Sequence, residues 1–571
     1  MKTSESQRLI LAARYLRRDE QGAVVETPEE MCRRVARGVA SAEAAWGAAP
    51  AEVARWEEEF YHLLDRLDFL PNSPTLINCG GPLGQLAACF VLPLEDDIAA
   101  IFETLKNAAL IHKSGGGTGF DFSPLRPRGT PVHHTRGLAS GPVSFMRVFN
   151  AATEEIRQGG VRRGANMGIL RVDHPDIREF IGAKLQESTF RNFNLSVAVT
   201  DRFMLAVQRG ERWPLVFGGR QFGEVEAAEL FAEMAASAHR CGDPGLLFLD
   251  AINRANPVPA LGTITATNPC GEQPLLPYES CTLGSINLAH MTRGREIDWD
   301  KLDYTVRVAV RFLDDVLEVN RFPLPRIARA TRRTRKIGLG VMGWADMLFQ
   351  LRVAYDSEAA LELAEQVMGF VSERGRQVSG ELARERGPFP AWKRSIFYPH
   401  RPLRNATVTT IAPTGSISAL ADTTSGIEPA FALRFSRRVL DNRVLDVVNR
   451  VFLEYAEREL GPAAREAAMR ALQEQGCLGQ TSGLPPHAKE VFKTALEIAP
   501  EWHLRMQAAF QRHTDNAVSK TVNLPAETGV QQVAEIFNRA HALGLKGITV
   551  YRYGSRADQP LGSPVTCRAC Q

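Results

Sequence analysis

The sequence predicts an α/β fold with a largely parallel sheet, preceded by a small helical domain. Strand-like runs alternate with helical runs from residue 71 to about residue 555, as in parallel sheets covered by helices. Residues 7–70 are expected to be helical, because apolar positions recur at helical spacing in Leu9-Ile-Leu-Ala-Ala-Arg-Tyr-Leu16 and Val53-Ala-Arg-Trp-Glu-Glu-Glu-Phe60. The 571 residues also exceed the usual size of one domain, so a large domain with an appendage is expected.

The predicted elements fall into three regions. The helical domain covers residues 1–70, the main domain covers 71–555, and 556–571 form a short polar tail. The expected strands of the main domain are 87–92, 117–122, 166–172, 194–199, 283–288, 406–411, 519–524 and 547–552. Its expected helices are 141–157, 226–239, 300–319, 357–385, 440–459 and 529–543.

Composition and charge narrow the function classes. Hydrophobic residues make up 44% and charged residues 23%, which is ordinary for a globular protein. A net charge of +3 gives no reason to expect nucleic acid or an anionic membrane as partner. No apolar run approaches the ~18–20 residues of a membrane helix, and the N-terminus lacks the apolar centre of a signal peptide. We therefore expect a cytoplasmic protein whose nine cysteines are kept reduced.

The segment Asn268-Pro-Cys-Gly-Glu-Gln273 carries the strongest chemical pattern. It places an amide, a thiol and a carboxylate at alternate positions, Asn268, Cys270 and Glu272. The Pro and Gly between them do not suit a helix or strand interior, so a tight loop is predicted. If the loop is extended, the three side chains would converge on one small substrate. A surface turn with a chance cysteine is the alternative at this point.

Further motifs follow the same order as in a known family. Asn72-Ser-Pro-Thr-Leu76 precedes a predicted buried strand with Cys89, and Cys281 lies in Glu279-Ser-Cys-Thr-Leu-Gly-Ser-Ile-Asn-Leu288. The others are Lys113-Ser-Gly-Gly-Gly-Thr-Gly-Phe120, Gln158-Gly-Gly-Val-Arg-Arg-Gly-Ala-Asn166, Ala412-Pro-Thr-Gly-Ser-Ile-Ser418 and Gly547-Ile-Thr-Val-Tyr-Arg-Tyr-Gly-Ser-Arg556. From about residue 8 to about residue 556 the chain resembles ribonucleotide reductase catalytic chains.

The resemblance implies a specific fold and chemistry. The fold would be a ten-stranded α/β barrel of two five-stranded halves, with the Cys270 loop as a finger in its centre. Cys270 would carry a thiyl radical, Glu272 would take the 3′-hydroxyl proton, and Asn268 would hold the ribose hydroxyls. Hydroxide leaves the 2′ carbon with difficulty, and a radical at the 3′ carbon makes that departure accessible. Cys89 and Cys281 would become a disulfide on each turnover; a buried structural cysteine is the alternative for each.

The tail carries a second cysteine pair. Cys567 and Cys570 form a Cys-x-x-Cys motif, which suits thiol exchange with a thioredoxin- or glutaredoxin-type reductant. Half of a zinc ribbon is the rival interpretation, although no second ligand pair lies nearby. No other metal site is predicted.

Phosphate binding is expected at two places. Residues 113–119 do not follow the P-loop order, but their glycines would permit close approach of the backbone to a phosphate. Residues 413–418 follow an apolar run, and a helix starting there would offer free N–H groups to an anion. A capping turn is the alternative. The resemblance places the substrate diphosphate at these residues: Ser73, Thr75, Pro413, Thr414, Gly415, Ser416, Ile417 and Ser418.

The resemblance also implies regulation. A dNTP or ATP effector would bind at the interface of a homodimer, beside Asp96 and Arg126. Residues 115–129 match specificity loop 1 of the family, and residues 157–166 match specificity loop 2. Arg162 or Arg163 in loop 2 would reach towards the ribonucleotide substrate, with a solvated basic turn as the alternative.

The C-terminal strand indicates how the radical is made. Class I reductases use two adjacent tyrosines to take the radical from a second subunit, whereas this chain reads Tyr551-Arg-Tyr553. That form is similar to class II enzymes, which use adenosylcobalamin. We expect an adenosylcobalamin-dependent ribonucleoside-diphosphate reductase. A class I large subunit and an inactive nucleotide-binding regulatory protein are the alternatives, and the preference for diphosphates over triphosphates comes from the family alone.

Overall fold

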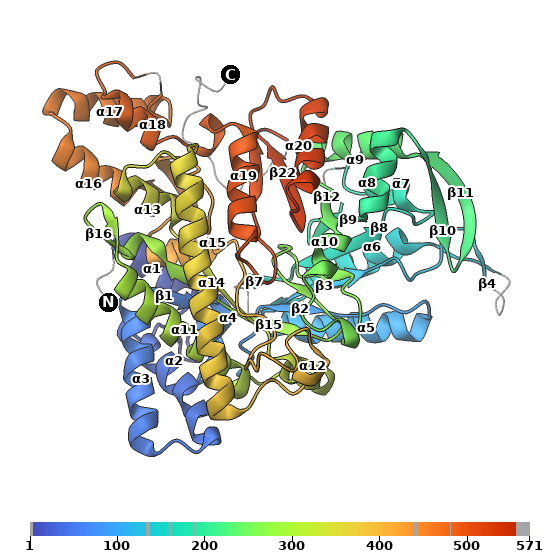
Figure 1. The fold of residues 1–571 in the computed structure, drawn as a ribbon, viewed down its shortest axis with the longest axis horizontal. Coiled ribbons are helices and arrows are strands. Elements are labelled where there is room, and N and C mark those ends of the chain that lie inside the picture. The colour runs from blue at the N-terminus through green and yellow to red at the C-terminus, as the bar shows by residue number, and fades with distance from the viewer. Residues whose placement is uncertain are drawn as a thin grey trace.

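The N-terminal part of the chain is helical, as the sequence predicts. The computed structural model describes residues 4–132, 137–158, 162–186, 189–438, 444–479 and 481–555. It begins with α1 (Glu5–Arg14), α2 (Pro28–Ala40) and α3 (Pro50–Asp65), which gather at one corner of the molecule (Figure 1). Capping boxes begin α1 at Ser4 and α2 at Thr27. In each, the cap hydroxyl accepts from the backbone N–H three residues later, and the side chain of that later residue accepts from the N–H of the cap.

These helices share one hydrophobic cluster with part of the main domain. The cluster includes apolar side chains of α11 (Trp299–Val319) and α14 (Glu358–Arg386), and α2 and α3 contact α11 directly. A buried ion network also joins the two parts, and its members are Glu43, Arg311, Asp314, Asp315, Arg335, Arg386 and Arg404. Within it Arg386 lies 2.7 Å from Glu43 and 2.6 Å from Asp315, and these three side chains are almost fully buried. Glu43 belongs to the helical domain and the other members belong to the main domain, so the network crosses the boundary between the two.

One large mixed sheet forms the centre of the molecule. Its strands run in the order β1 (Phe69–Pro71), β15 (Ser280–Asn287), β2 (Cys89–Val91), β3 (Gly117–Asp121), β8 (Asn166–Arg171), β9 (Phe193–Val199), β12 (Gly245–Phe248), β22 (Gly547–Arg552) and β21 (Thr521–Leu524). β18 (Ile337–Met342) pairs with β15. The run from β2 to β12 is parallel, and β15–β2 and β12–β22 are antiparallel joints. The sheet is therefore largely parallel, as predicted, and its regular strands do not close on themselves.

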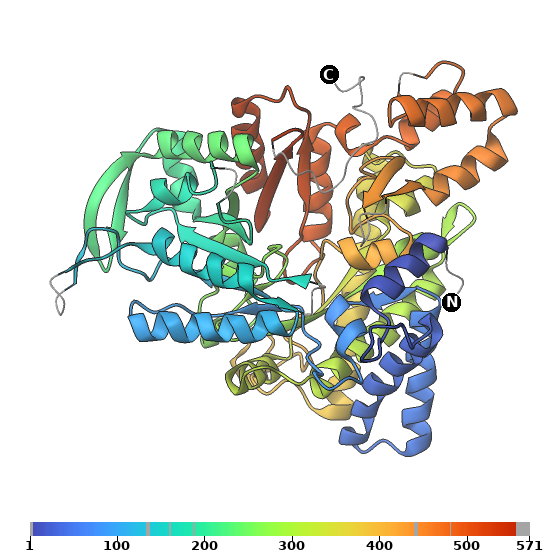
Figure 2. The ribbon, with the colours of Figure 1, turned by 180° about the vertical axis from the view of Figure 1, so that it is seen from behind.

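Helices surround this sheet on several sides (Figures 1 and 2). α5 (Ile98–Lys113) and α6 (Pro142–Glu155) lie side by side, and α9 (Ala227–Cys241) and α20 (Val530–Ala542) pack together nearby. The remaining α-helices are α4 (Ser73–Asn78), α7 (Ile177–Ile181), α8 (Asp201–Arg209), α10 (Leu249–Arg254), α12 (Pro325–Thr334), α13 (Trp344–Leu351), α15 (Gly415–Ala421), α16 (Arg450–Glu459), α17 (Pro462–Glu474), α18 (Pro486–Val491) and α19 (Pro500–Gln511).

Two predicted elements differ from the structure. Residues 406–411 do not form a regular strand, because they make only isolated parallel bridges, Thr409 with Leu339 and Ile411 with Val518. The helix expected over 440–459 is wrong at residues 444–448. Val444–Val448 form β20, which pairs with β19 (Arg434–Arg438) in a hairpin, and the β-branched valines favour a strand. Asn449 then caps α16, since its side chain accepts a hydrogen bond from the N–H of Phe452.

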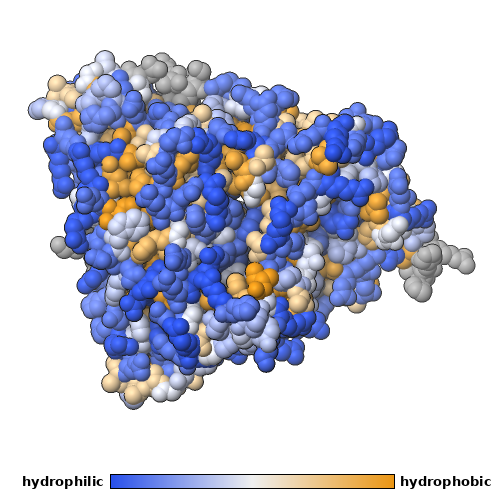
Figure 3. Space-filling view, in the orientation of Figure 1, coloured by the Kyte–Doolittle hydropathy of each residue, from blue (hydrophilic) through white to orange (hydrophobic). Residues whose placement is uncertain are grey.

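The surface is mainly hydrophilic on the face shown in Figure 3, with apolar residues in small separate patches. α5 and α6 carry an apolar stripe: Ile98, Phe102 and Leu110 of α5 and Val148 of α6 are all exposed. Within the described ranges, no helix is both long enough and apolar enough to span a bilayer.

Candidate active site

A short hairpin carries the Asn268–Gln273 motif. β13 (Ala266–Thr267) and β14 (Pro274–Leu275) form its two strands, and we call residues 266–275 the finger hairpin. The predicted tight loop is confirmed, although the chain turns instead of extending: Gly271 has φ +81°, and its N–H donates to the carbonyl of Asn268. As a result Asn268 and Glu272 are buried on the inner side, whereas Cys270 is exposed at the tip.

The glycine-rich segment 113–120 makes room for this hairpin. A Cβ atom on Gly119 would lie 1.7 Å from the carbonyl oxygen of Thr267, and one on Gly117 would lie 2.9 Å from the Pro269 ring. The side chain of Asn194 also donates a hydrogen bond of 2.8 Å to the carbonyl of Pro269. The glycines of β3 thus allow the finger hairpin to cross the sheet in direct contact, a role that the sequence pattern did not indicate.

Four of the five predicted catalytic residues form one buried cluster. The amide Nδ2 of Asn268 donates to Sγ of Cys89 at 3.1 Å, and that thiol lies 3.9 Å from Oε1 of Glu272. Cys281 is directly opposite Cys89 in the antiparallel pairing of β15 with β2. Residues about 180 positions apart in the sequence therefore meet beneath the finger hairpin. Cys270 stands above them at its tip.

Burial controls the protonation of this cluster. It raises the pKa of Glu272 to about 7, while hydrogen bonds from Asn268 and Cys89 act in the opposite direction. Burial also raises the pKa of Cys89 and of Cys281 well above the usual thiol value. Both thiols are thus neutral near pH 7, and Glu272 exchanges a proton easily in that range, as a general base requires.

Several residues that support the cluster were missed by the sequence analysis. The carbonyl of Glu272 accepts hydrogen bonds from Oγ1 of Thr410 at 2.8 Å and from the N–H of Ala517 at 3.0 Å. Lys336 is fully buried and pairs with Glu279 at 2.6 Å, and its charge partly offsets the raised pKa of Cys281. These positions lie far from the motif in sequence, and no spacing rule connects them to it.

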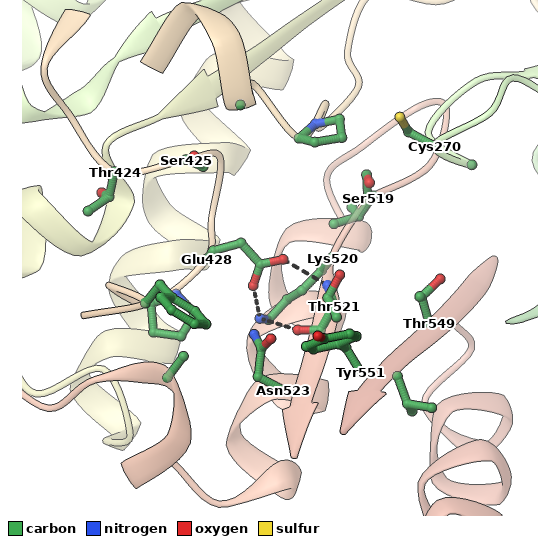
Figure 4. A pocket seen from close by; sticks show the side chains of 18 of the residues that line it. Cys270, Thr424, Ser425, Glu428, Ser519, Lys520, Thr521, Asn523, Thr549 and Tyr551 are labelled. Atoms are coloured by element: carbon green, nitrogen blue, oxygen red, sulfur yellow. Dashed lines mark hydrogen bonds and ion pairs between the residues drawn. The ribbon is translucent and has the colours of Figure 1, made fainter. Parts of the chain in front are cut away.

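Cys270 lines a cavity of about 700 Å³. It extends to β21 and β22, and Figure 4 shows Cys270 at one end with Thr549 and Tyr551 along the wall. Its apolar lining comes from several strands and the segment before β19, and includes Met167, Leu195, Leu247, Phe431, Phe435, Val447, Val448, Ile548 and Val550. The exposed thiol thus opens into a space large enough for a sizeable ligand.

A buried charged group lies in the wall of the cavity (Figure 4). Nζ of Lys520 donates to Oε2 of Glu428 at 2.6 Å and to Nδ1 of His503 at 3.0 Å. The other oxygen of Glu428 accepts from the N–H of Thr521 at 2.7 Å. Lys520 is buried, whereas the Glu428 side chain remains 24% exposed. A carboxylate held in this way can accept further hydrogen bonds from a ligand.

Of the residues predicted to bind phosphate at 413–418, some line the cavity or are exposed, and others are buried. Pro413 and Gly415 line the cavity, and Gly415 and Ser416 at the start of α15 are exposed. Thr414 has φ +56°, and its hydroxyl accepts from the N–H of Gly426 instead of capping α15. Ile417 is buried, and Ser418 is also buried, with its hydroxyl 2.9 Å from that of Ser425.

Ser73 and Thr75 lie at the start of α4, outside the lining of this cavity. The hydroxyl of Ser73 is 3.0 Å from that of Tyr15. The hydroxyl of Thr75 is 3.0 Å from Oδ1 of Asn72 and 3.0 Å from the carbonyl of Leu86. Both hydroxyls therefore have protein partners in this structure.

The predicted effector residues occupy another region. Arg126 and Asp96 form an ion pair of 2.7 Å near the start of α5. Arg162 and Arg163 form β7, which pairs with β6 (Arg157–Gln158) in the segment predicted to be specificity loop 2. Cys567 and Cys570 lie outside the described residues.

Comparison with known proteins identifies the family. The profile for "Ribonucleotide reductase, all-alpha domain" matches residues 1–84, and that for "Ribonucleotide reductase, barrel domain" matches 87–401 and 398–551. The chain belongs to the ribonucleotide reductase family.

Named relatives confirm the resemblance to class II enzymes. The chain is 52% identical over 557 residues to a "Vitamin B12-dependent ribonucleoside-diphosphate reductase" of Mycobacterium tuberculosis, covering 97% of this chain and 80% of the relative. A protein of the same name from Thermoplasma acidophilum is 47% identical and covers 97% of this chain and 79% of its own length. Among solved structures, the class Id ribonucleotide reductase alpha subunit of Actinobacillus ureae matches with a TM-score of 0.78 and 25% identity, covering 96% of this chain and 97% of that chain.

Proposed function

We propose that this protein reduces ribonucleoside diphosphates to 2′-deoxyribonucleotides with adenosylcobalamin as its source of radicals. One observation carries the proposal: Cys270 stands at the tip of the finger hairpin and faces a large cavity, directly above the cluster of Asn268, Glu272, Cys89 and Cys281. The two vitamin B12-dependent relatives support the cofactor and the diphosphate form of the substrate.

Each residue has a defined part in a balanced reaction. The Cys270 thiyl would take the 3′ hydrogen atom from the ribose, and Glu272 would accept the 3′-hydroxyl proton, with Asn268 orienting the hydroxyls. The 2′-hydroxyl would leave as water after taking a proton from the Cys89–Cys281 pair. That pair would also supply the hydrogen that ends on the 2′ carbon, so that it gives up two electrons in total and becomes a disulfide. Glu272 would return its proton to the 3′ oxygen, and Cys270 would return its hydrogen atom to the 3′ carbon.

The cavity fits the proposed cofactor. Adenosylcobalamin, when bound, supplies the radical chemistry that converts the Cys270 thiol into a thiyl. The apolar side chains of Phe431, Val447 and Ile548 would contact flat ring systems, and the partly exposed carboxylate of Glu428 would accept hydrogen bonds from hydroxyl or amide groups. The direct opening of this space onto the Cys270 thiol supports the fit.

We also propose a homodimer with dNTP or ATP effectors. The exposed apolar stripe of α5 and α6 supports the dimer, because two copies would cover each other's stripe. The Arg126–Asp96 pair near the start of α5 offers a cation and an acceptor for an effector nucleotide. Arg162 and Arg163 would couple the bound effector to the choice of the ribonucleotide substrate. Ser73, Thr75 and residues 413–418 would hold the substrate diphosphate, and Cys567 and Cys570 would exchange electrons with a thioredoxin- or glutaredoxin-type reductant.

We also propose that the sheet closes into a ten-stranded barrel and that the chain has the predicted domain boundaries. A closed ten-stranded barrel would need residues 406–411 as a strand between β18 and β21. Hydrogen bonds from the N–H of Leu339 to Val408 at 2.7 Å and from the N–H of Ile411 to Ala517 at 3.1 Å support that closure. The proposed domains are 1–70, 71–555 and the tail 556–571. The proposed location is the cytoplasm, where thiols are kept reduced.

One assay tests the proposed function. Purified protein is given CDP or CTP anaerobically with dithiothreitol, with and without adenosylcobalamin. We expect deoxycytidine diphosphate to form only with the cofactor, and CDP to be preferred. Activity that requires a metal-loaded second protein instead would contradict the proposal and indicate a class I subunit.

A further inference from the structure

Four buried side chains form a continuous hydrogen-bond relay between the two specificity loops. His112 is in the last turn of α5, Thr118 in β3, Asn166 at the start of β8 and Thr153 in α6. Nε2 of His112 is 2.9 Å from Oγ1 of Thr118, which donates to Oδ1 of Asn166 at 2.7 Å. Nδ2 of Asn166 then donates to Oγ1 of Thr153 at 2.9 Å. All four residues are at most 4% exposed.

The donor and the acceptor can be assigned at each hydrogen bond of the relay. The hydroxyl of Thr153 donates to the carbonyl of Phe149, so it accepts from Asn166. The hydroxyl of Thr118 donates to Asn166, so it accepts from a protonated Nε2 of His112. Burial lowers the pKa of His112 to about 4, which keeps the ring neutral with this single arrangement near pH 7. Reversing the donor and the acceptor of one of these hydrogen bonds would therefore disrupt the neighbouring ones.

The relay touches both ends of specificity loop 2 (residues 157–166). Thr153 precedes the loop by one helical turn, and Asn166 is its last residue. Just before it, Gly164 packs against the relay: a Cβ there would lie 2.8 Å from Thr153 and 3.0 Å from the His112 ring. Thr118 belongs to specificity loop 1 (residues 115–129), and its N–H donates to the carbonyl of Ala165 at 3.0 Å. The same four residues therefore hold the base of both loops.

α5 connects this relay with the proposed effector site. The helix runs from Ile98, beside the Arg126–Asp96 pair, to Lys113, and its 16 residues span about 24 Å. A packed helix moves as a unit, so a shift at its effector end changes the position of His112 at the other. A lengthened His112–Thr118 contact would leave buried polar groups unsatisfied, which is costly, so Asn166 and the base of loop 2 must follow.

We propose that His112, Thr118, Asn166 and Thr153 are positioning residues that set the geometry of specificity loop 2 according to the effector bound near α5. The proposal rests on the effector control proposed above. It assigns substrate choice partly to side chains that contact neither nucleotide. These residues act through loop 2 and take no part in the chemistry at Cys270.

The test compares relay variants with a matched control. Thr118→Val and Thr153→Val each break the relay with little change in shape. Thr305→Val is the control, because its buried hydroxyl donates to the carbonyl of Lys301 one turn earlier in α11, as Thr153 does in α6. For each holoenzyme, kcat/KM is measured for CDP and ADP with and without dATP or dTTP. Equilibrium binding of the dNTPs and the melting temperature are measured in parallel.

We expect the relay variants to lose effector control selectively. Allosteric coupling is typically about 5- to 150-fold, and in both variants the dNTP-induced change in the CDP/ADP preference should shrink towards one. dNTP affinity and turnover without effector should remain close to wild type, and Thr305→Val should keep the full response. Gly164→Ala gives a second, independent variant, since its methyl group would press against His112 and Thr153 from the loop side.

Three results would overturn the inference. A wild-type response to dNTPs in Thr118→Val, Thr153→Val and Gly164→Ala would show that the relay does not set loop 2. A parallel fall of melting temperature and of effector-free turnover, with the dNTP-induced change retained, would show a merely structural role. If the wild-type enzyme itself shows no dNTP effect, the proposed effector control fails first, and this inference falls with it.

Discussion

Cys281 lies directly opposite Cys89 across the antiparallel strands β15 and β2. Opposed residues of such strands have Cα atoms about 4.5–5.5 Å apart, within the range of about 4.4–6.8 Å that a disulfide spans. Oxidation of this pair therefore needs no movement of either strand. The Asn268 amide that contacts Cys89 links the pair to the finger hairpin.

The pair should be the reductant of the reaction. We expect Cys89→Ser and Cys281→Ser each to abolish net turnover with dithiothreitol, because a single thiol cannot deliver two electrons. Peptide mass mapping of wild-type protein after one cycle without reductant should find a Cys89–Cys281 disulfide. Cys32→Ala, at a buried cysteine in α2, should retain activity. A different disulfide after turnover would contradict this assignment.

Cys270 should be required for chemistry and not for binding. Its side chain is exposed at the tip of the finger hairpin, so Cys270→Ser should leave the fold and CDP affinity nearly unchanged. Deoxynucleotide formation should disappear, because an O–H bond is too strong to replace S–H. Binding is measured at equilibrium and turnover with adenosylcobalamin present. Turnover of the serine variant comparable to wild type would remove Cys270 from its proposed role.

Glu272 should give the reaction a pH dependence near neutrality. Because burial raises its pKa to about 7, kcat/KM should rise with pH as the carboxylate ionises. Glu272→Gln should lose about 10²- to 10⁴-fold in rate and flatten this rise. Absence of an ionisation near pH 7 in the wild-type profile would argue against Glu272 as the base.

The same ionisation should affect stability with the opposite sign. The pKa of Glu272 is raised above its usual value of 4.5 in the folded state, so the folded protein binds the proton more tightly than the unfolded chain. Its contribution to the free energy of unfolding is therefore lost as pH rises from about 4.5 through about 7. The melting temperature of the wild type should therefore fall relative to that of Glu272→Gln as pH rises across this range, because Gln resembles the protonated carboxyl and does not titrate. A difference between the two proteins that does not change with pH would contradict this expectation.

Gly119→Ala should impair catalysis by moving the finger hairpin. A Cβ atom at this position would lie 1.7 Å from the carbonyl oxygen of Thr267, so the hairpin must shift away from β3. Misplacement of a catalytic group by about 1 Å can cost about 10²-fold in rate. Gly223→Ala in β11 (Arg220–Glu226) is the control, because nothing lies within 4 Å of its Cβ. Equal activity of both variants would show that the hairpin tolerates the displacement.

The tail cysteines should matter only for a protein reductant. With thioredoxin, the Cys567→Ser/Cys570→Ser variant should stop after about one cycle, because a protein cannot reach buried Cys89 and Cys281. With dithiothreitol, much of the activity should survive. The melting temperature should barely change. Stoichiometric zinc in the wild type that is lost in the variant would instead support a metal-binding tail.

The sequence predicted the local backbone of the site better than the contacts that support it. The Asn268–Gln273 pattern indicated a tight loop because Pro and Gly limit the backbone locally, and this was confirmed. The contacts of Glu272 with Thr410 and Ala517 could not be predicted, since they depend on long-range packing. Convergence of the three side chains was expected if the loop is extended, whereas the loop turns at Gly271 and separates Cys270 from Asn268 and Glu272, because alternate spacing does not distinguish a short strand from a turn.

The missed strands have a similar explanation. β18 contains Gly338 and Gly340, which weaken its strand pattern in sequence. The structure shows why glycine stands there: a Cβ on Gly340 would lie 2.2 Å from the carbonyl oxygen of Thr410. The same crossing leaves residues 406–411 with isolated bridges in place of the regular strand that their apolar pattern predicts. Close backbone contacts thus explain both differences: β18 was missed because of its glycines, and 406–411 was predicted as a regular strand but forms only isolated bridges.

The ion network across the N-terminal boundary makes the helical domain and the sheet thermodynamically inseparable. Removing Glu43 together with α1–α3 would leave Arg386 and Arg311 without their shared carboxylate inside the protein. Arg386 would keep Asp314 and Asp315, and Arg311 would keep Glu385, but removing one partner of a buried ion pair is still destabilising, typically by about 3–5 kcal/mol. The catalytic part should therefore not be obtainable as an independently folding fragment, and both regions should denature in one cooperative step.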